Sequence, residues 1–389
     1  MTHPEPPAAT QPSPFPEQPG GDAPDQDHAD AVPPVPPVPP VTPRAITLAA
    51  ATVATSILVA VAAIVPVPYA VQSPGPTRDT LGESAGQPLI TVEGTETYES
   101  SGALLLTTVS VSGGPGYPVG LPMLVRGWLD GSRAVTPVEQ VFPTTDTRED
   151  IDERNQALMI SSQEHAAVAA LEELGYEVPT ELVVVEAIAG SGAEGVVQPE
   201  DVVQDLDGEG LTSFSELSAR MDDVQPGETV RLGVERAGSR HELEITTVED
   251  ETSGRALLGV IIDPEFELPV DVSIAIEDIG GPSAGSMFAL GIIDLLTEED
   301  ETGGETIAGT GTVDLTGAIG PIGGIRQKLA GAVRDEAAWF LAPEGNCDEV
   351  VGHVPDGLSV VSVETLADAR AAVQAIGTGQ GVSLPTCTG

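Results

Sequence analysis

Two side chains in the C-terminal half of the chain are suited to chemistry, Ser283 and Lys328. Lys328 is the only lysine, because Lys and Arg total 15 and the sequence contains fourteen Arg. An arginine keeps its proton in a protein, whereas a desolvated lysine can lose it and act as a base. The single lysine therefore indicates a position at which arginine would not serve.

Ser283 lies in the turn Gly-Gly-Pro-Ser-Ala-Gly at 280–285, directly before an apolar segment with helical character. Small neighbours let a polypeptide approach, and the start of a helix favours developing negative charge. A serine hydroxyl is a weak nucleophile until a base takes its proton. Lys328, 45 residues downstream (328 − 283) among apolar neighbours, would be that base in a Ser-Lys route to acyl transfer. The alternative is an ordinary turn in which Ser283 caps the helix.

Composition excludes several other functions. A formal net charge of -46 and a pI near 4.1 argue against nucleic acid, which requires clustered Lys and Arg. The five His form no HExxH pattern, and the glycines at 309–317 lack the spacing of a dinucleotide loop. We therefore expect neither a metal nor a cofactor.

The N-terminal region indicates a membrane anchor. Residues 1–44 are rich in Pro and acidic side chains and predict a disordered tail. Residues 45–65 carry no charge over 21 positions, which suits a membrane-spanning helix. The residues at 66–70 make a poor cleavage site, which favours an anchor over a signal peptide. The default orientation for one N-terminal anchor predicts a cell-membrane protein with an extracytoplasmic body, although the flanking charges Arg44 and Arg78 say little.

The meaning of the two cysteines depends on the compartment. Cys347 and Cys387 lie 40 residues apart (387 − 347) and fit no metal-ligand spacing. In a cytosolic chain they would be two unrelated small hydrophobic residues, whereas outside the membrane a disulfide is the better interpretation.

The body of the chain mixes strand and helix patterns. Residues 66–181 predict strands followed by a helix at 150–175. Residues 182–250 predict a compact module of strands with one capped helix and a closing hairpin. Residues 255–378 alternate without a regular strand-helix-strand repeat, and 379–389 form a tail. The predicted fold class is therefore α+β.

The module at 182–250 resembles the PDZ domains attached to bacterial proteases. The resemblance rests on the phrase SGAEGVVQPEDVV at 191–203 and on the order of the elements. It implies a module that holds an extended peptide by adding it to a sheet edge. The alternative is a β-rich spacer without a ligand, and the sequence does not locate a groove.

Residues 255–378 resemble the proteolytic domain of the Lon proteases. The matching motifs are Gly-Pro-Ser-Ala-Gly at 281–285 and the phrase that ends in Lys328, at 319–328, with a Thr-Gly pair at 310–311 between them. The usual Asp three residues before the serine is Gly280 here. The resemblance implies that Ser283 and Lys328 are catalytic and that the site is lined by Gly281, Pro282, Ala284, Thr310, Gly323 and Gly324.

The whole arrangement resembles the membrane-anchored Lon-like proteases of Gram-positive bacteria. A helix at 159–175 is similar to an early helix of the Lon proteolytic domain, so the PDZ-like module would be an insertion in that domain. The chain has no GxxxxGK[ST] loop, so we expect proteolysis without ATP bound to this chain. The resemblance also implies polypeptide substrates, namely misfolded or tagged exported proteins, and a hexameric homo-oligomer. The alternative function is a scaffold with an idle protease-like site.

Overall fold

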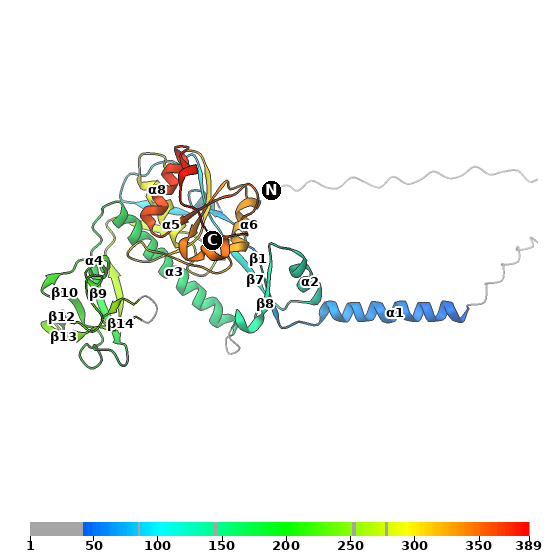
Figure 1. Cartoon of the computed structure of the whole chain (residues 1–389), viewed down its shortest axis with the longest axis horizontal. Coiled ribbons are helices and arrows are strands. Elements are labelled where there is room, and N and C mark those ends of the chain that lie inside the picture. The colour runs from blue at the N-terminus through cyan, green and yellow to red at the C-terminus, as the bar shows by residue number, and fades with distance from the viewer. Residues whose placement is uncertain (1–41, 85, 143–146, 251–253, 277–278, 389) are drawn as a thin grey trace, which may run out of the picture. The chain divides into compact units, whose positions relative to one another are not determined.

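The computed structural model describes residues 42–84, 86–142, 147–250, 254–276 and 279–388 (Figure 1). The chain divides into two units, Met1–Ile57 and Leu58–Gly389. The first described element is the helix α1 (Pro43–Ile64), close to the predicted span at 45–65. Its segment Pro43–Ala62 is long and apolar enough to cross a membrane, a property that signal sequences share.

A five-stranded sheet forms the centre of the second unit, in the order β2-β6-β18-β21-β22. β2 pairs antiparallel with β6, and the remaining strands are parallel. The bounds are β2 (Arg78–Asp79), β6 (Ala103–Leu106), β18 (Thr306–Gly309), β21 (Trp339–Pro343) and β22 (Ser359–Val363). Parallel strands buried on both faces read as continuous apolar runs, as ALLL at 103–106 does.

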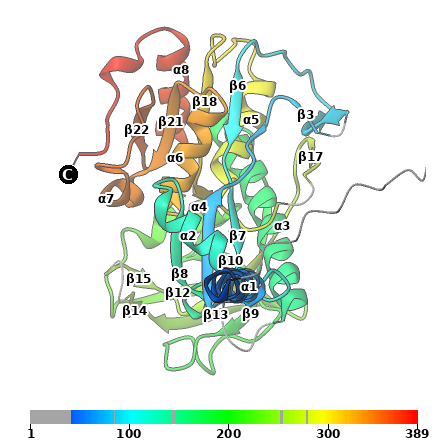
Figure 2. The same cartoon turned by 90° about the vertical axis from the view of Figure 1, so that its right-hand side faces the viewer.

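Helices cover both faces of this sheet (Figure 2). Leu104 and Leu106 point to a core shared with three helices, whereas Leu105 points to a second core on the opposite face. The first core holds α3 (Arg148–Glu173), α5 (Gly285–Leu296) and α8 (Leu366–Gly377), and the second holds α6 (Ile325–Arg334) and α7 (Cys347–Val350). The alternation of side chains along a strand thus separates two cores.

Short sheets surround this centre. One has the order β7-β1-β8, with β1 in the middle and antiparallel to both neighbours. Helix α2 (Leu121–Leu129) lies in a region that the sequence predicted as strands, so that part of the prediction was wrong. The remaining bounds are β1 (Tyr69–Pro74), β3 (Glu83–Ser84), β4 (Gln87–Pro88), β5 (Ile90–Glu93), β7 (Val109–Ser112), β8 (Ala134–Pro137), β17 (Asp271–Ile274), β19 (Thr312–Val313) and β20 (Ile319–Gly320).

A smaller module has its own sheet and core. Its strands follow the order β13-β12-β10-β9-β16, and β12 and β13 form the predicted hairpin. β16 pairs with β9 over its whole length, so it belongs to this module, although the sequence grouped 256–263 with the last domain. The bounds are β9 (Thr180–Ala187), β10 (Val202–Leu206), β11 (Glu209–Gly210), α4 (Phe214–Met221), β12 (Thr229–Arg236), β13 (Ser239–Thr246), β14 (Val248–Glu249), β15 (Ala256–Leu257) and β16 (Val260–Phe266).

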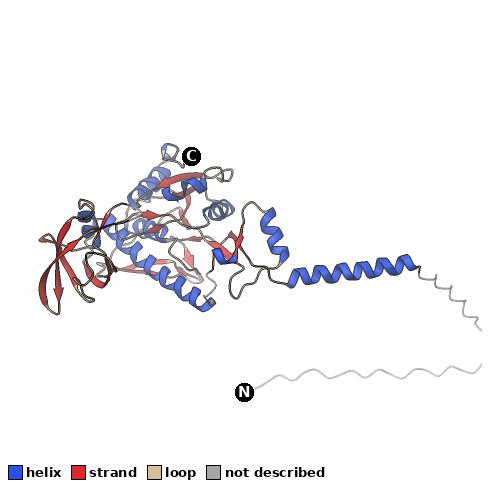
Figure 3. Cartoon of the chain, turned by 60° about the horizontal axis from the view of Figure 1, so that its bottom comes forward, coloured by secondary structure: helices blue, strands red, loops and turns tan. Residues whose placement is uncertain are grey.

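The main core is built from both sides of this module. It contains residues from Leu89 to Val178 before the module and from Val270 to Ile376 after it. Helices and strands are mixed through the body, as the α+β prediction requires (Figure 3). The segment that carries Ser283 and Lys328 therefore packs on elements that lie far earlier in the chain.

Candidate active site

The turn before α5 presents Ser283 one residue ahead of the helix N-cap, Ala284. Gly281 has a φ of +87°, a backbone conformation that glycine adopts without strain. Helix α3 holds this turn from outside. The Gly281 N–H donates to the Asn155 carbonyl oxygen at 2.9 Å, and Ser162 Oγ donates to the Pro282 carbonyl oxygen at 3.0 Å.

Lys328 lies in the first turn of α6, which starts after Gly324 in a left-handed conformation with φ of +72°. The side chain is only 2% exposed. Burial lowers the pKa of Lys328 from 10.5 to about 7, and desolvation is its only cause. At neutral pH a large fraction of this amine therefore carries no proton.

Two side chains meet the amine of Lys328. Lys328 Nζ lies 2.8 Å from Ser283 Oγ and 2.7 Å from Thr310 Oγ1. Thr310 Oγ1 in turn donates to the Ser283 carbonyl oxygen at 2.8 Å, so its only proton is in use. Thr310 must therefore accept a proton from Nζ, which leaves the lone pair of a neutral amine available to the nearby Ser283 hydroxyl.

A cavity of about 510 Å³ opens beside Ser283 and Lys328. Of the expected lining residues, Gly281, Ala284 and Gly323 lie on its wall. Pro282, Thr310 and Gly324 do not lie on this wall. Thr310 contacts Lys328, and the carbonyl of Pro282 anchors the turn.

The opposite wall of the cavity was missed by the sequence interpretation. It consists of Thr107, Thr108 and residues Val109 to Val111 of β7. β7 pairs with β1 on one side only, so within the described residues its other edge is free to bind an extended chain. These residues lie in the region where the sequence predicted strands, but nothing in their residue types marks a site.

A second cavity, of about 900 Å³, continues from the first. The two share wall residues: Tyr117, Met159, Ile279 and Gly280. Ile274 and Ile276 add apolar surface to the second cavity. Together the two cavities offer room for several residues of an extended polypeptide beside Ser283.

Gly280 marks a close approach between the turn and α3. A Cβ atom at this position would lie 2.7 Å from the Cβ of Asn155, well inside normal contact. Helix α3 thus occupies the space that an aspartate would need. This packing gives a physical reason for glycine at the position where the Lon pattern has Asp.

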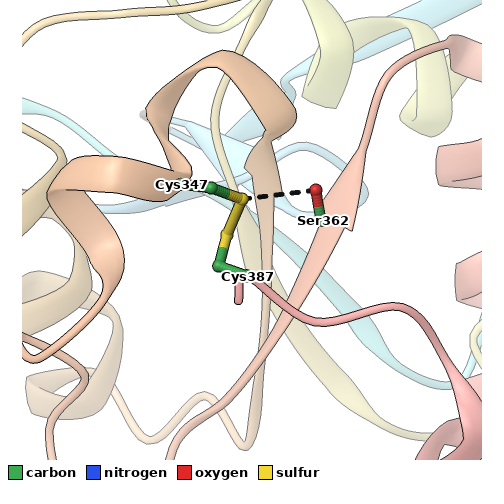
Figure 4. Close-up of a disulfide and its surroundings, with 3 residues drawn as sticks. All are labelled: Cys347, Ser362 and Cys387. Carbon is green, nitrogen blue, oxygen red and sulfur yellow. Dashed lines mark hydrogen bonds between the residues drawn. A yellow bond between two sulfur atoms is a disulfide. The ribbon is translucent and has the colours of Figure 1, made fainter. Parts of the chain in front are cut away.

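The two cysteines are joined by a disulfide in the structure (Figure 4). Cys347 begins α7, and Cys387 packs against the core on the α6 face of the sheet. The Cys347 sulfur also contacts Ser362 Oγ at 3.4 Å, as Figure 4 shows. The bond attaches the C-terminal segment to the body.

In the parts of the chain that the structure describes, no group of three or more His, Cys, Asp or Glu is placed to hold a metal ion.

Comparison with known proteins finds relatives for this part of the chain. Residues 269–374 match the Lon protease (S16) C-terminal proteolytic domain. The Lon protease of Clostridioides difficile is 36% identical over 110 residues, covering 26% of this chain and 14% of that protein. Lon protease 2 of Herpetosiphon aurantiacus is 32% identical over 167 residues, covering 41% of this chain and 18% of that protein.

Among solved structures, this chain is similar to the PDZ domain of the SdrC-like protein from Listeria monocytogenes. The match covers 22% of this chain and 88% of that domain, at 17% identity and a TM-score of 0.20. The equivalent domain from Listeria innocua matches 21% of this chain, at 18% identity and a TM-score of 0.21.

These observations define a protease-type domain with a serine at its cleft. Residues 269–374 are a Lon-type proteolytic domain, and such a domain supports serine peptidase activity. The matched segments span less than a fifth of the length of the two Lon proteases named above. The family match at residues 269–374 contains both Ser283 and Lys328.

Proposed function

We propose that the protein is a membrane-anchored, extracytoplasmic serine endopeptidase with a Ser-Lys dyad. The observation that carries this proposal is the 2.8 Å separation between Lys328 Nζ, whose pKa burial lowers to about 7, and Ser283 Oγ. A neutral amine at hydrogen-bonding distance from a serine hydroxyl is the arrangement that nucleophilic catalysis requires.

The proposed reaction begins with neutral Lys328. Its lone pair takes the Ser283 proton as Oγ attacks the carbonyl carbon of the scissile peptide bond. The resulting ammonium then gives its proton to the leaving amine, and an ester on Ser283 remains. A water molecule, deprotonated by Lys328, hydrolyses this ester and restores both side chains.

The turn at Ser283 supplies groups for the developing oxyanion. Within the described ranges, the backbone N–H groups of Ser283 and Ala284 donate to no protein acceptor. They lie directly ahead of the N-terminus of α5, where negative charge is favoured. We assign these two N–H groups to the oxyanion of the tetrahedral intermediate.

The substrate would be an extended polypeptide. The free edge of β7 can pair with its backbone, and the two joined cavities can take its side chains. In the smaller module, a further cavity of about 340 Å³ lies between α4 and the strands β15 and β16. We propose that this cavity binds polypeptide and that the substrates of the enzyme are misfolded or tagged exported proteins.

The remaining parts of the chain fit an anchored, exported enzyme. Helix α1 would cross the cell membrane once, with residues 66–389 outside. A disulfide between Cys347 and Cys387 persists in an oxidising compartment. Because Lon domains assemble into rings, we also propose a homo-oligomer.

The decisive experiment compares hydrolysis of an unfolded protein, such as casein, by the full chain and two variants. We expect activity in the wild-type chain and none in Ser283→Ala or Lys328→Arg, because arginine keeps its proton. A folded wild-type chain that binds polypeptide without cleaving it would instead indicate the scaffold function. Activity retained in Lys328→Arg would refute the dyad.

A further inference from the structure

Helix α2 carries an apolar stripe that faces away from the protein core. Leu121, Val125, Trp128 and Leu129 recur at helical spacing and share one face. They are 39%, 41%, 62% and 82% exposed, respectively. The buried face of the helix uses other residues, Leu124 and Gly127. Exposed apolar surface of this kind marks a contact with a protein or a membrane.

Both ends of α2 are tied to the few residues that follow α1. The Val67 N–H donates to the carbonyl oxygen of Val119, two residues before α2, at 2.9 Å. Near the other end of α2, the ring of Tyr69 meets the ring of Trp128 edge to face, with centroids 6.4 Å apart. The structure thus holds α2 against residues 67–69.

Chain length limits how far this contact can lie from the end of α1. Val67 and Tyr69 follow Ile64, the last residue of α1, by three and five positions. At about 3.5 Å per residue, they lie within roughly 10 and 17 Å of that end. The headgroup layer on each side of a bilayer is about 5–8 Å thick. If α1 spans a membrane, α2 is therefore held at its surface.

We infer that α2 lies in the surface of the bilayer that α1 crosses, with the stripe of Leu121, Val125, Trp128 and Leu129 inserted among the lipids. This inference rests on the proposed membrane anchor. A nine-residue helix cannot span a bilayer, but an apolar stripe suits the boundary between headgroups and acyl chains. Trp and Tyr side chains favour the same depth, where an apolar ring meets water.

Charge favours insertion by apolar contact over electrostatic attraction. The chain has a formal net charge of -46, so an anionic lipid surface repels it as a whole. The stripe itself contains no charged residue, and Arg126 is exposed on the flank of the helix. The contact should therefore form on neutral lipid and change little with salt.

The contact would also fix the catalytic cavity relative to the membrane. A Cβ atom on Gly127 would meet Val135 of β8 and Val71 of β1, at 2.7 and 3.3 Å, so α2 packs closely on this sheet. The third strand of the same sheet is β7, which lines the cavity at Ser283. Helix α2 and the cavity wall are thus parts of one small sheet assembly.

Fluorescence of Trp128 tests the inference in the full chain. The sequence has two tryptophans, so Trp339→Phe leaves Trp128 as the only one. This variant is reconstituted in phosphatidylcholine vesicles with and without bromine atoms on the acyl chains. We expect bromine to lower Trp128 emission at least about twofold, and aqueous iodide to have little effect. In the matched control Trp128→Phe, the half-buried Trp339 of β21 should not respond to bromine.

The outcomes separate the inference from the proposed anchor. Flotation of the vesicles after an alkaline wash reports the anchor, and a chain that fails to float refutes it. A chain that floats while Trp128 is quenched by iodide and not by bromine refutes the position of α2 alone. A Leu129→Cys variant that cross-links to a second copy, with Trp128 unquenched by bromine, would also overturn the inference and assign the stripe to an interface between copies.

Discussion

The reactivity of Ser283 should depend on pH through the proton on Lys328. An exposed lysine with a pKa of 10.5 has only about 0.0003 of its amine neutral at pH 7. Burial lowers the pKa of Lys328 to about 7, at which about half of the amine is neutral at pH 7. The structure therefore raises the amount of base available at neutral pH by roughly a thousandfold or more.

The assay is the rate of Ser283 labelling by a fluorophosphonate probe between pH 5 and pH 9. We expect the rate to rise about tenfold per pH unit below pH 7 and to level off above it, because only the neutral amine accepts the proton. The labelling rate of the Lys328→Arg variant should be at least about a thousandfold lower, because the guanidinium keeps its proton. Ser283→Ala gives the background. A rate that is flat across this range would refute the reasoning.

A stability measurement tests the burial of Lys328 without relying on activity. The folded pKa of about 7 lies below the usual 10.5, so between these values the unfolded chain binds more protons than the folded one. Stability should therefore rise with pH across this window, by up to about 1.4 kcal/mol per unit and about 5 kcal/mol in all. In the Lys328→Met variant, the free energy of unfolding should not rise with pH in this way. Parallel pH profiles of the unfolding free energy for the two chains would contradict the burial.

Three further variants probe the surroundings of Ser283 and Lys328 and the disulfide. Thr310→Val keeps the shape of the side chain but removes the acceptor for Lys328 Nζ. Activity should therefore fall about 10- to 100-fold, while the melting temperature changes little. Unchanged activity would exclude the positioning role of Thr310. Gly280→Asp places a Cβ atom 2.7 Å from the Cβ atom of Asn155, so both activity and melting temperature should fall. A wild-type melting temperature would show that the turn has room for a side chain. Replacing Cys347 and Cys387 by Ser removes a bond between residues 40 positions apart. The free energy of unfolding measured in urea should fall by about 4 kcal/mol. Free thiols in the unreduced wild-type chain would argue against the bond.

Elements with strong local signals could be predicted from the sequence. The turn at 280–285 and the apolar segment after it predicted a helix, and α5 lies there in the structure. The only lysine of the sequence, Lys328, is the residue whose amine lies against Ser283. In each case the residues that carry the signal lie within one turn or one helix.

Elements whose role depends on distant partners could not be predicted. The apolar residues of β16 suit either neighbouring domain, and only its pairing with β9 assigns it to the smaller module. Helix α2 is short and contains β-favouring residues, and its packing on β1 and β8 overrides that local preference. The part of β7 in the cavity wall likewise follows from its position beside α6 and not from its residue types.

The low pKa of Lys328 illustrates why such partners matter for function. Its helix, α6, packs against segments from the start of the body: Arg334 donates to the Gly75 carbonyl oxygen at 2.8 Å. A Cβ atom on Gly324 would lie 2.7 Å from Val109 of β7. These contacts come from residues before 269–374, the segment that matches the Lon domain. The matched segment thus supplies the serine and the lysine, whereas the burial that lowers the pKa of Lys328 also requires the N-terminal part of the fold.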